Sequence, residues 1–212
     1  IVGLYDDQFQ PLEVFHRENH EIKTPGGRGE DSLAQSLAAS MSEMAFKPAP
    51  HYLLAPNDEI FFGFANAYEI KVYSPDGKLA RTIRKDFDPA PVTAKDKEQY
   101  EKLQRAVFLR FLPAQAESAK KKALRLINYP KYKPAYQDFT VADNGWLFVI
   151  VDSRGNESTV LDVFDAQGHY IARTEAAIPP EMLRFKKGKA YAIATEDSYK
   201  SVKRFSYTVR EN

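Results

Sequence analysis

The stretch IKVYSPDGKLARTI, residues 70–83, recurs in altered form as LDVFDAQGHYIARTE, residues 161–175. Each stretch alternates apolar and polar residues up to an aromatic residue, crosses a polar turn that contains glycine, and continues into Ala-Arg-Thr. Alternation of this kind is typical of a half-buried β-strand, and a glycine-containing turn between two such runs is typical of a β-hairpin. The same hairpin pattern therefore occurs twice in this chain.

The repeat extends beyond these hairpins. Residues 52–83 and 139–174 each divide into four short apolar runs separated by turn signals. The turns match in order: Pro-Asn-Asp at 56–58 corresponds to Asp-Asn-Gly at 143–145, and Ser-Pro-Asp-Gly at 74–77 corresponds to Asp-Ala-Gln-Gly at 165–168. These residue types favour tight turns. Each copy is therefore predicted to form a four-stranded antiparallel meander.

Two partial copies flank the complete ones. Residues 3–15 repeat the last two strands of the unit, and residues 181–209 repeat the first three. A recurring four-stranded meander is the signature of a β-propeller blade, whose apolar face needs a neighbouring blade to cover it. The sequence thus predicts an all-β fold, a β-propeller of four-stranded antiparallel blades, of which about three and a half are visible. The alternative is two unrelated hairpins that share turn chemistry.

Three segments also resemble a known family. They are YEIKVYSPDGKLARTIRKDFDPAPVT, YPKYKPAYQDFTVADNGWLFV and VLDVFDAQGHYIAR, and they are similar to bacterial six-bladed β-propeller proteins of the NHL-like group. The resemblance covers residues 50–210. It implies six blades and an exported protein, periplasmic or extracellular, but no single activity, because propellers host lyases, lactonases and plain binding scaffolds alike.

The blade count leads to an expectation about completeness. Residues 1–212 are expected to form a single β-propeller domain that is incomplete at its N-terminus. A blade that lacks a strand exposes unpaired backbone groups and an apolar face. We therefore expect the open blade edges to be covered, either by upstream sequence or by another chain.

Helical patterns interrupt the blades. Residues 86–135 are predicted to be a helical insertion, with helices over 93–112 and 114–127 that meet at Pro113. Thr93 is a plausible N-cap with Asp96 three residues on. The first helix places apolar residues on one face, which we expect to pack on the ring: Tyr100, Leu103, Val107 and Phe111. A second insertion carries a short helix from Asp31 or Ser32, with a face formed by Leu33, Leu37, Met41 and Met44.

Charge and composition exclude several classes of function. The chain has 30 Lys and Arg against 29 Asp and Glu, a formal charge of +1, which gives no reason to expect nucleic-acid binding. It has no cysteine, so disulfides, thiolate catalysis and Cys-based metal sites are excluded. No apolar run is long enough for a transmembrane helix. The basic cluster Lys120-Lys121-Lys122 fits either a surface for an acidic partner or a solvated helix face, and the second interpretation is favoured.

The repeat itself locates a candidate site. Aligning the three first strands by their turns puts His51, Asp138 and Glu181 at one equivalent position, where the innermost strand of each blade begins. Imidazole and carboxylates are the groups of a metal site or an acid/base pair. The alternative is that the first residues of these strands are polar because they are exposed to solvent. An error of one residue in the alignment would also turn each side chain to the other face of its sheet.

Two functions follow from these observations. The first is a non-catalytic binding or protein-interaction scaffold that takes a protein or a small-molecule ligand and uses no cofactor. The alternative is a metal-dependent propeller hydrolase or lyase, with a divalent metal held at the channel mouth by His51, Asp138 and Glu181.

Overall fold

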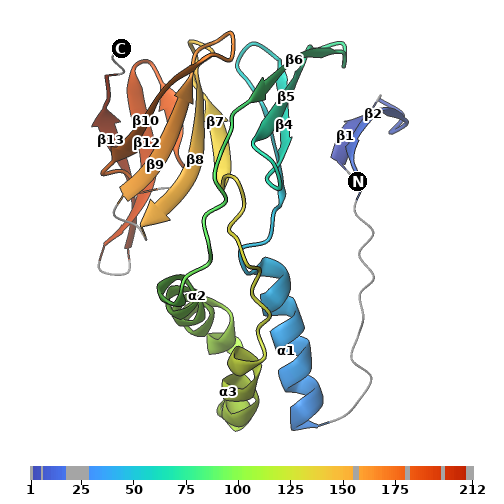
Figure 1. Cartoon of the computed structure of the whole chain (residues 1–212), viewed down its shortest axis with the longest axis vertical. Helices are drawn as coiled ribbons and strands as arrows, with labels where there is room; N and C mark the ends of the chain where they lie inside the picture. The colour runs from blue at the N-terminus through green and yellow to red at the C-terminus, as the bar shows by residue number, and fades with distance from the viewer. Residues whose placement is uncertain are drawn as a thin grey trace. The chain divides into compact units, whose positions relative to one another are not determined.

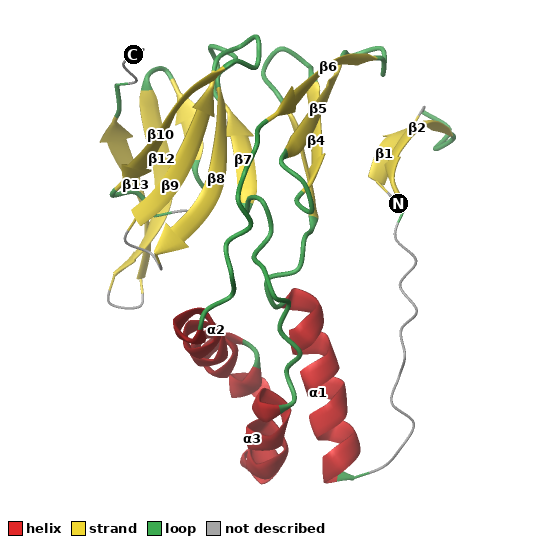
Figure 2. Ribbon diagram, viewed as in Figure 1, coloured by secondary structure: helices red, strands yellow, loops and turns green. Residues whose placement is uncertain are grey.

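The computed structural model describes residues 2–5, 7–17, 29–154, 158–179, 182–196 and 199–208. The chain divides into two compact units. Strands make up the first unit, which comprises Ile1–Arg17, Ala49–Phe87 and Ala135–Asn212. Helices make up the second, which comprises Glu18–Pro48 and Asp88–Pro134 (Figure 2).

The strand unit contains the two predicted meanders. The first sheet has the order β3-β4-β5-β6, with β3 at Pro50–Leu54, β4 at Ile60–Phe64, β5 at Glu69–Tyr73 and β6 at Leu79–Arg84. The second has the order β10-β9-β8-β7, with β7 at Asp138–Val141, β8 at Leu147–Arg154, β9 at Ser158–Phe164 and β10 at Tyr170–Ala176 (Figure 1). All neighbouring strands are antiparallel. The prediction of two equivalent meanders is confirmed.

The partial copies also form sheets. β1 (Val2–Tyr5) pairs with β2 (Pro11–His16), and β11 (Arg184–Lys186), β12 (Lys189–Glu196) and β13 (Tyr199–Ser206) form a three-stranded sheet in that order. These are the two last and the three first strands that the repeat predicts. The protein is therefore all-β in its first unit, built of β-propeller blades, and carries helical insertions.

The matching turns have matching hydrogen bonds. Ser74 N–H donates to the Lys78 carbonyl, and Asp165 N–H donates to the His169 carbonyl, both at 2.9 Å. Gly77 and Gly168 close these turns with φ of 81° and 91°. That region of φ strongly favours glycine. The glycine in each copy is thus required by the turn, which explains why the hairpin signal is strong in the sequence.

Apolar faces of consecutive blades bury one another. One cluster joins the first complete blade to the second, and another joins the second complete blade to the β11-β12-β13 sheet. β8 serves both clusters because its side chains alternate: Leu147 and Val149 face the first, whereas Phe148 and Ile150 face the second. A blade buried on both faces is what the propeller arrangement requires.

The helices of the second unit are shorter than predicted. α1 spans Glu30–Met44, α2 spans Ala94–Val107, and α3 spans Glu117–Arg125. The predicted capping box is present, since Thr93 and Asp96 bond each other's backbone N–H. The predicted helix over 93–112 instead ends at Val107, followed by a 3₁₀ turn at Leu109–Phe111. No helix in the described part of the chain is long and apolar enough to span a bilayer.

The predicted apolar face of α2 is largely wrong. Of its four members only Tyr100 packs inward, against Phe46 and Tyr129 and with its hydroxyl bonded to the Met41 carbonyl. The other three are exposed: Leu103, Val107 and Phe111. α1 packs closer to prediction, because Leu37 and Met41 are buried, although Ala34 and Ala38 complete its face in place of Leu33 and Met44.

Candidate functional site

Two of the three predicted site residues lie together. β7 is adjacent to both β3 and β11, so the innermost strands of consecutive blades are neighbours. His51 lies in β3 and Asp138 begins β7, and His51 Nδ1 is 3.4 Å from Asp138 Oδ1. Two residues separated by a blade and a helical insertion thus lie close together. Glu181 lies outside the described residues.

The environment of Asp138 favours its ionised form. Burial alone would raise the pKa of this carboxyl, but His51, the Phe139 N–H and the charge of Arg184 outweigh it, so the pKa lies below its ordinary value. The Phe139 N–H donates to Asp138 Oδ1 at 2.8 Å. A carboxylate held in this way can orient the imidazole ring, because Nδ1 then has a fixed partner.

Aromatic rings fix the other side of His51. Its ring centroid is 5.7 Å from that of Tyr136 and 6.2 Å from that of Phe139. Tyr136 is fully buried, and burial is the main reason that its pKa is raised. The imidazole therefore sits between a carboxylate and an apolar wall, with little freedom to turn.

Arg184 is the member of this site that the sequence did not identify. It is the first residue of β11 and acts on the Asp138 carboxyl by its charge. β11 and β12 are joined by the two-residue turn Lys187-Gly188, since Lys186 pairs with Lys189. The corresponding turns in the complete blades are longer. The shorter turn is visible in the sequence. An alignment of the third blade that is counted back from this turn places a different residue near Asp138.

The described residues offer a pair of groups rather than a metal cage. No three His, Cys, Asp or Glu side chains within the described ranges converge as a metal site would require. His51 and Asp138 could supply two ligands to a divalent ion, and Arg184 would oppose its charge. What this arrangement can do by itself is bind a polar group or hold a proton on a positioned imidazole.

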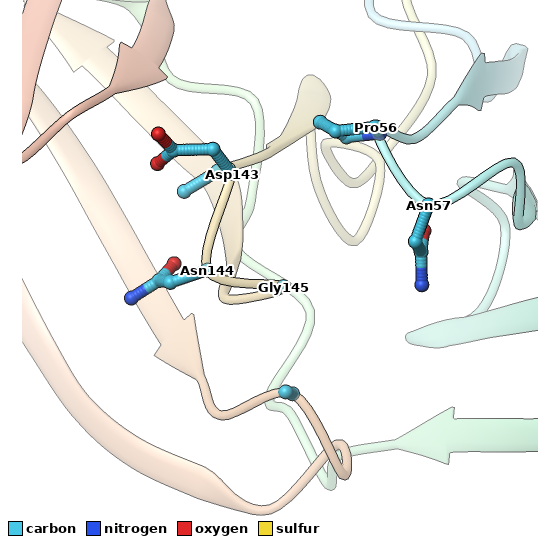
Figure 3. A pocket seen from close by; sticks show the side chains of 7 residues that line it. Pro56, Asn57, Asp143, Asn144 and Gly145 are labelled. Carbon is cyan, nitrogen blue, oxygen red and sulfur yellow. The ribbon is translucent and has the colours of Figure 1, made fainter.

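A cavity lies at the opposite ends of the inner strands, where they turn into β4 and β8. Its volume is about 280 Å³. Figure 3 shows Asp143 and Asn144 extending from one turn and Pro56 and Asn57 from another. Two oxygens of its lining already accept backbone hydrogen bonds: Asp143 Oδ2 accepts the Lys187 N–H at 2.9 Å and Asn144 Oδ1 accepts the Trp146 N–H at 3.2 Å. This cavity is better explained as a by-product of turn packing than as a ligand site.

The basic cluster of α3 is mostly engaged within the helical unit. Lys120 donates to the Leu112 carbonyl at 3.1 Å and lies 3.5 Å from Glu117, while Lys122 pairs with Asp31 at 2.6 Å. These bonds favour the interpretation of a structural, solvated helix face.

A buried charge cluster joins the two complete blades. Asp162 of β9 is fully buried and receives two hydrogen bonds from Arg173 of β10, both of 2.8 Å. From the other blade, the Tyr68 hydroxyl donates to Asp162 at 2.8 Å and Lys85 Nζ lies 3.6 Å away. Burial alone would raise the pKa of Asp162, but Arg173 and Tyr68 hold it below the ordinary value. We assign this cluster to blade-to-blade stability.

Comparison with known proteins adds little. The sequence matches no protein-family model and no curated protein. Virginiamycin B lyase from Staphylococcus aureus, solved as a catalytically inactive variant with quinupristin, aligns with 75% of this chain at 15% identity and a TM-score of 0.30. The chain spans 41% of that protein's length. A likeness this weak carries no argument.

Proposed function

We propose that this protein is a non-catalytic protein-interaction scaffold built on propeller blades. The observation that supports it is the exposure of two large apolar side chains on the inner strand β3, Tyr52 at 64% and Leu54 at 67%. Their cross-strand partners are Phe62 and Ile60, on the same face of the sheet. Exposed apolar groups gathered on one face are typical of a binding surface.

Part of the same face of this sheet is already covered by an aromatic side chain of β2. Phe15 of β2 packs on Phe62 and Tyr73, with ring centroids 5.4 and 4.4 Å apart. The outer part of the face is thereby covered, while Tyr52 and Leu54 stay open. Tyrosine is common at the energetic centre of interfaces because its ring is rigid and its hydroxyl can bond. A partner that inserts apolar side chains here would continue packing that β2 has already begun.

Photo-crosslinking tests this proposal. A photoreactive amino acid replaces Tyr52 in protein expressed in the cells it comes from, and Lys78, in an exposed turn of the same blade, is the control position. We expect a discrete crosslinked partner from position 52, lost on Leu54→Asp, and none from position 78. Equal labelling from both positions would contradict a specific surface.

The second candidate, a metal-dependent hydrolase or lyase, is favoured by the approach of His51 to Asp138. It predicts a stoichiometric divalent metal in the purified protein, reduced by His51→Ala and by Asp138→Ala. The control is Glu43→Ala, which removes an exposed partner of Lys47 on α1 in the helical unit. Elemental analysis that finds bound metal with this dependence would replace the scaffold proposal.

Six blades, an NHL-like relationship and export to the periplasm or beyond belong to the same proposal. They rest on the resemblance of the repeat segments to that bacterial group. Fractionation of cells that make the natural protein tests export, and recovery in the cytoplasm alone would contradict it.

A further inference from the structure

The helical unit leaves large apolar side chains uncovered around the end of α2. On this helix Leu103 is 54% exposed and Val107 is 52% exposed. They are four positions apart, so they are neighbours on one side of the helix. Phe111 follows in the 3₁₀ turn after α2 and is 73% exposed. We call Leu103, Val107 and Phe111 the apolar patch.

Packing within the helical unit does not account for the apolar patch. The core of this unit is formed by residues of α1, the 3₁₀ turn and α3, such as Leu109 and Ala123, while α2 buries Gln104. A helix that packed by its apolar residues would bury Leu103 and Val107 in preference to a glutamine. The patch also lies in the insertion between β6 and β7. It is therefore not part of any face that neighbouring blades bury against each other.

The stretch of chain that carries the apolar patch is strongly basic. Residues 94–134 contain 11 Lys and Arg against four Asp and Glu, in a chain whose formal charge is only +1. Lys102, Arg105 and Arg110 alternate with the members of the patch, and all three are exposed. No Asp or Glu occurs between 102 and 116. The patch therefore lies in a region of positive potential.

Two of these cations border the apolar patch directly. The Arg110 guanidinium lies 4.5 Å from the centre of the Phe111 ring. Lys102 precedes Leu103 on α2 and is about a quarter of a turn around the helix from it. Long cationic side chains keep their stems against apolar surroundings and hold their charge in a polar layer. The patch and its cations thus form one amphipathic surface.

We propose that this surface binds a membrane that contains anionic phospholipids. A helix with Leu and Phe on one side and Lys and Arg on the other lies in the interface of a bilayer, with its apolar side among the outer parts of the acyl chains. Basic side chains near the bilayer are attracted to anionic headgroups. The inference goes beyond the proposed scaffold function, because it states where the scaffold is held.

The arrangement favours a lipid surface over a folded acidic partner. Phe111 is the most exposed member of the patch and stands beside Arg110, so its ring can insert among lipid chains while the guanidinium stays among the phosphates. A folded partner would need a carboxylate placed opposite each cation. A bilayer with anionic lipids presents negative charge across its whole surface.

Vesicle sedimentation tests the proposal on the intact chain. One set of vesicles is phosphatidylcholine alone, and the other contains about a third phosphatidylglycerol. We expect binding at least about tenfold tighter to the anionic vesicles, because each Lys or Arg close to the surface adds attraction. This binding should weaken as salt is raised. No binding to the anionic vesicles, or equal binding to both sets, would overturn the proposal.

A fluorescent probe tests which side of α2 meets the lipid. The chain has no cysteine, so a single introduced one can carry an environment-sensitive dye. Val107→Cys places the dye in the patch, whereas Glu98→Cys places it on the opposite, exposed side, since nine residues at about 100° each make two and a half turns. We expect anionic vesicles to shift the emission to the blue from position 107 alone. A shift from both positions, or from position 98 alone, would contradict the orientation.

Charge reversal tests the electrostatic part. Lys102→Glu with Arg105→Glu should weaken binding to the anionic vesicles by about tenfold or more. The matched control, Lys78→Glu with Arg84→Glu, makes the same change in net charge at exposed positions of the strand unit and should leave binding unaltered. Equal losses in the two variants would reduce the effect to net charge and overturn the site. Circular dichroism checks that each variant folds.

Removing apolar side chains separates insertion from attraction by charge. Leu103→Gln with Val107→Gln keeps every charge and should weaken vesicle binding by about tenfold. The matched control, Leu33→Gln with Met44→Gln, removes two exposed apolar side chains of α1 and should leave binding unaltered. Binding that survives loss of Leu103 and Val107 would overturn insertion of the patch.

The remaining outcomes separate this inference from its alternatives. Polyglutamate that binds the chain more tightly than the anionic vesicles do, and loses that binding in Lys102→Glu with Arg105→Glu, would replace the membrane with an acidic protein partner. Crosslinking at position 52 does not depend on α2. Vesicle binding that fails while that crosslink forms would overturn this inference and leave the scaffold function standing.

Discussion

The hydroxyl of Tyr68 donates a 2.8 Å hydrogen bond to the buried carboxylate of Asp162, 94 residues later in the chain and in the next blade. Arg173 holds the same carboxylate from the adjacent strand with two further bonds. The ion pair therefore supplies charge balance within one blade, and Tyr68 ties the preceding blade to it. Lys85 lies over the Tyr170 ring at 4.9 Å and adds positive charge beside the carboxylate.

Removing this carboxylate should loosen both blades. Asp162→Ala leaves Arg173 without its partner, and we expect the free energy of unfolding to fall by about 2–3 kcal/mol. This is near the lower end of the loss expected when a buried ion pair is broken, because Arg173 is half exposed. Tyr68→Phe should cost about 1–2 kcal/mol. Urea denaturation measures both. Arg84→Ala, which breaks an exposed cross-strand pair with Glu69, is the control and should cost less than about 1 kcal/mol.

The same carboxylate should make stability depend on acid pH. Its pKa is lowered in the folded protein, so its contribution is fully present above the unfolded value of about 3.9 and is lost as pH falls through the folded pKa. The difference in unfolding free energy between the natural chain and Asp162→Asn should therefore be constant above about pH 5 and shrink below about pH 4. A difference that stays constant down to pH 3 would show that the carboxylate is not stabilised as described.

The turn glycine of the second blade should be intolerant of any side chain. A Cβ at Gly168 would lie 2.8 Å from Cγ1 of Ile83, a core residue of the preceding blade, and the backbone there has φ of 91°. Gly188 has φ of 65° but open space around it, so Gly188→Ala tests backbone strain alone. We expect Gly168→Ala to cost about 1–3 kcal/mol more than Gly188→Ala because of the added overpacking. Ile83→Ala should reduce that excess in a double-mutant cycle, whereas equal costs at both glycines would contradict the contact.

Local rules predicted the blades well because each blade is a local object. The glycine turns and alternating strands need only neighbouring residues, and the repeat supplied the equivalence that brings His51 to Asp138. Asp162 could not be predicted in the same way. Asp162 lies in a strand buried on both faces, and it tolerates burial only because Tyr68 and Arg173 reach it from two blades. Nothing in the local pattern signals such a pairing.

The helices were predicted less well than the blades. The periodicity of α2 predicts a buried face that differs from the one in the structure. The periodicity predicts that Leu103 lies on the buried face of α2, yet it is 54% exposed, whereas Leu109 of the following 3₁₀ turn is 2% exposed within the cluster formed by α1 and α3. The helix ends at Val107, so the chain rotates and presents Leu109 rather than Phe111 to the core.

This difference makes a sharp paired test. Leu109→Asp puts a charge into an apolar cluster and should lower the free energy of unfolding by at least about 3 kcal/mol. Leu103→Asp puts the same charge on an exposed position and should change it by no more than about 0.5 kcal/mol. Thermal unfolding followed by circular dichroism at the helix band measures both. If Leu103→Asp lowered the midpoint as far as Leu109→Asp does, the exposed face of α2 would have to be covered in solution, and the packing of α2 described here would be wrong.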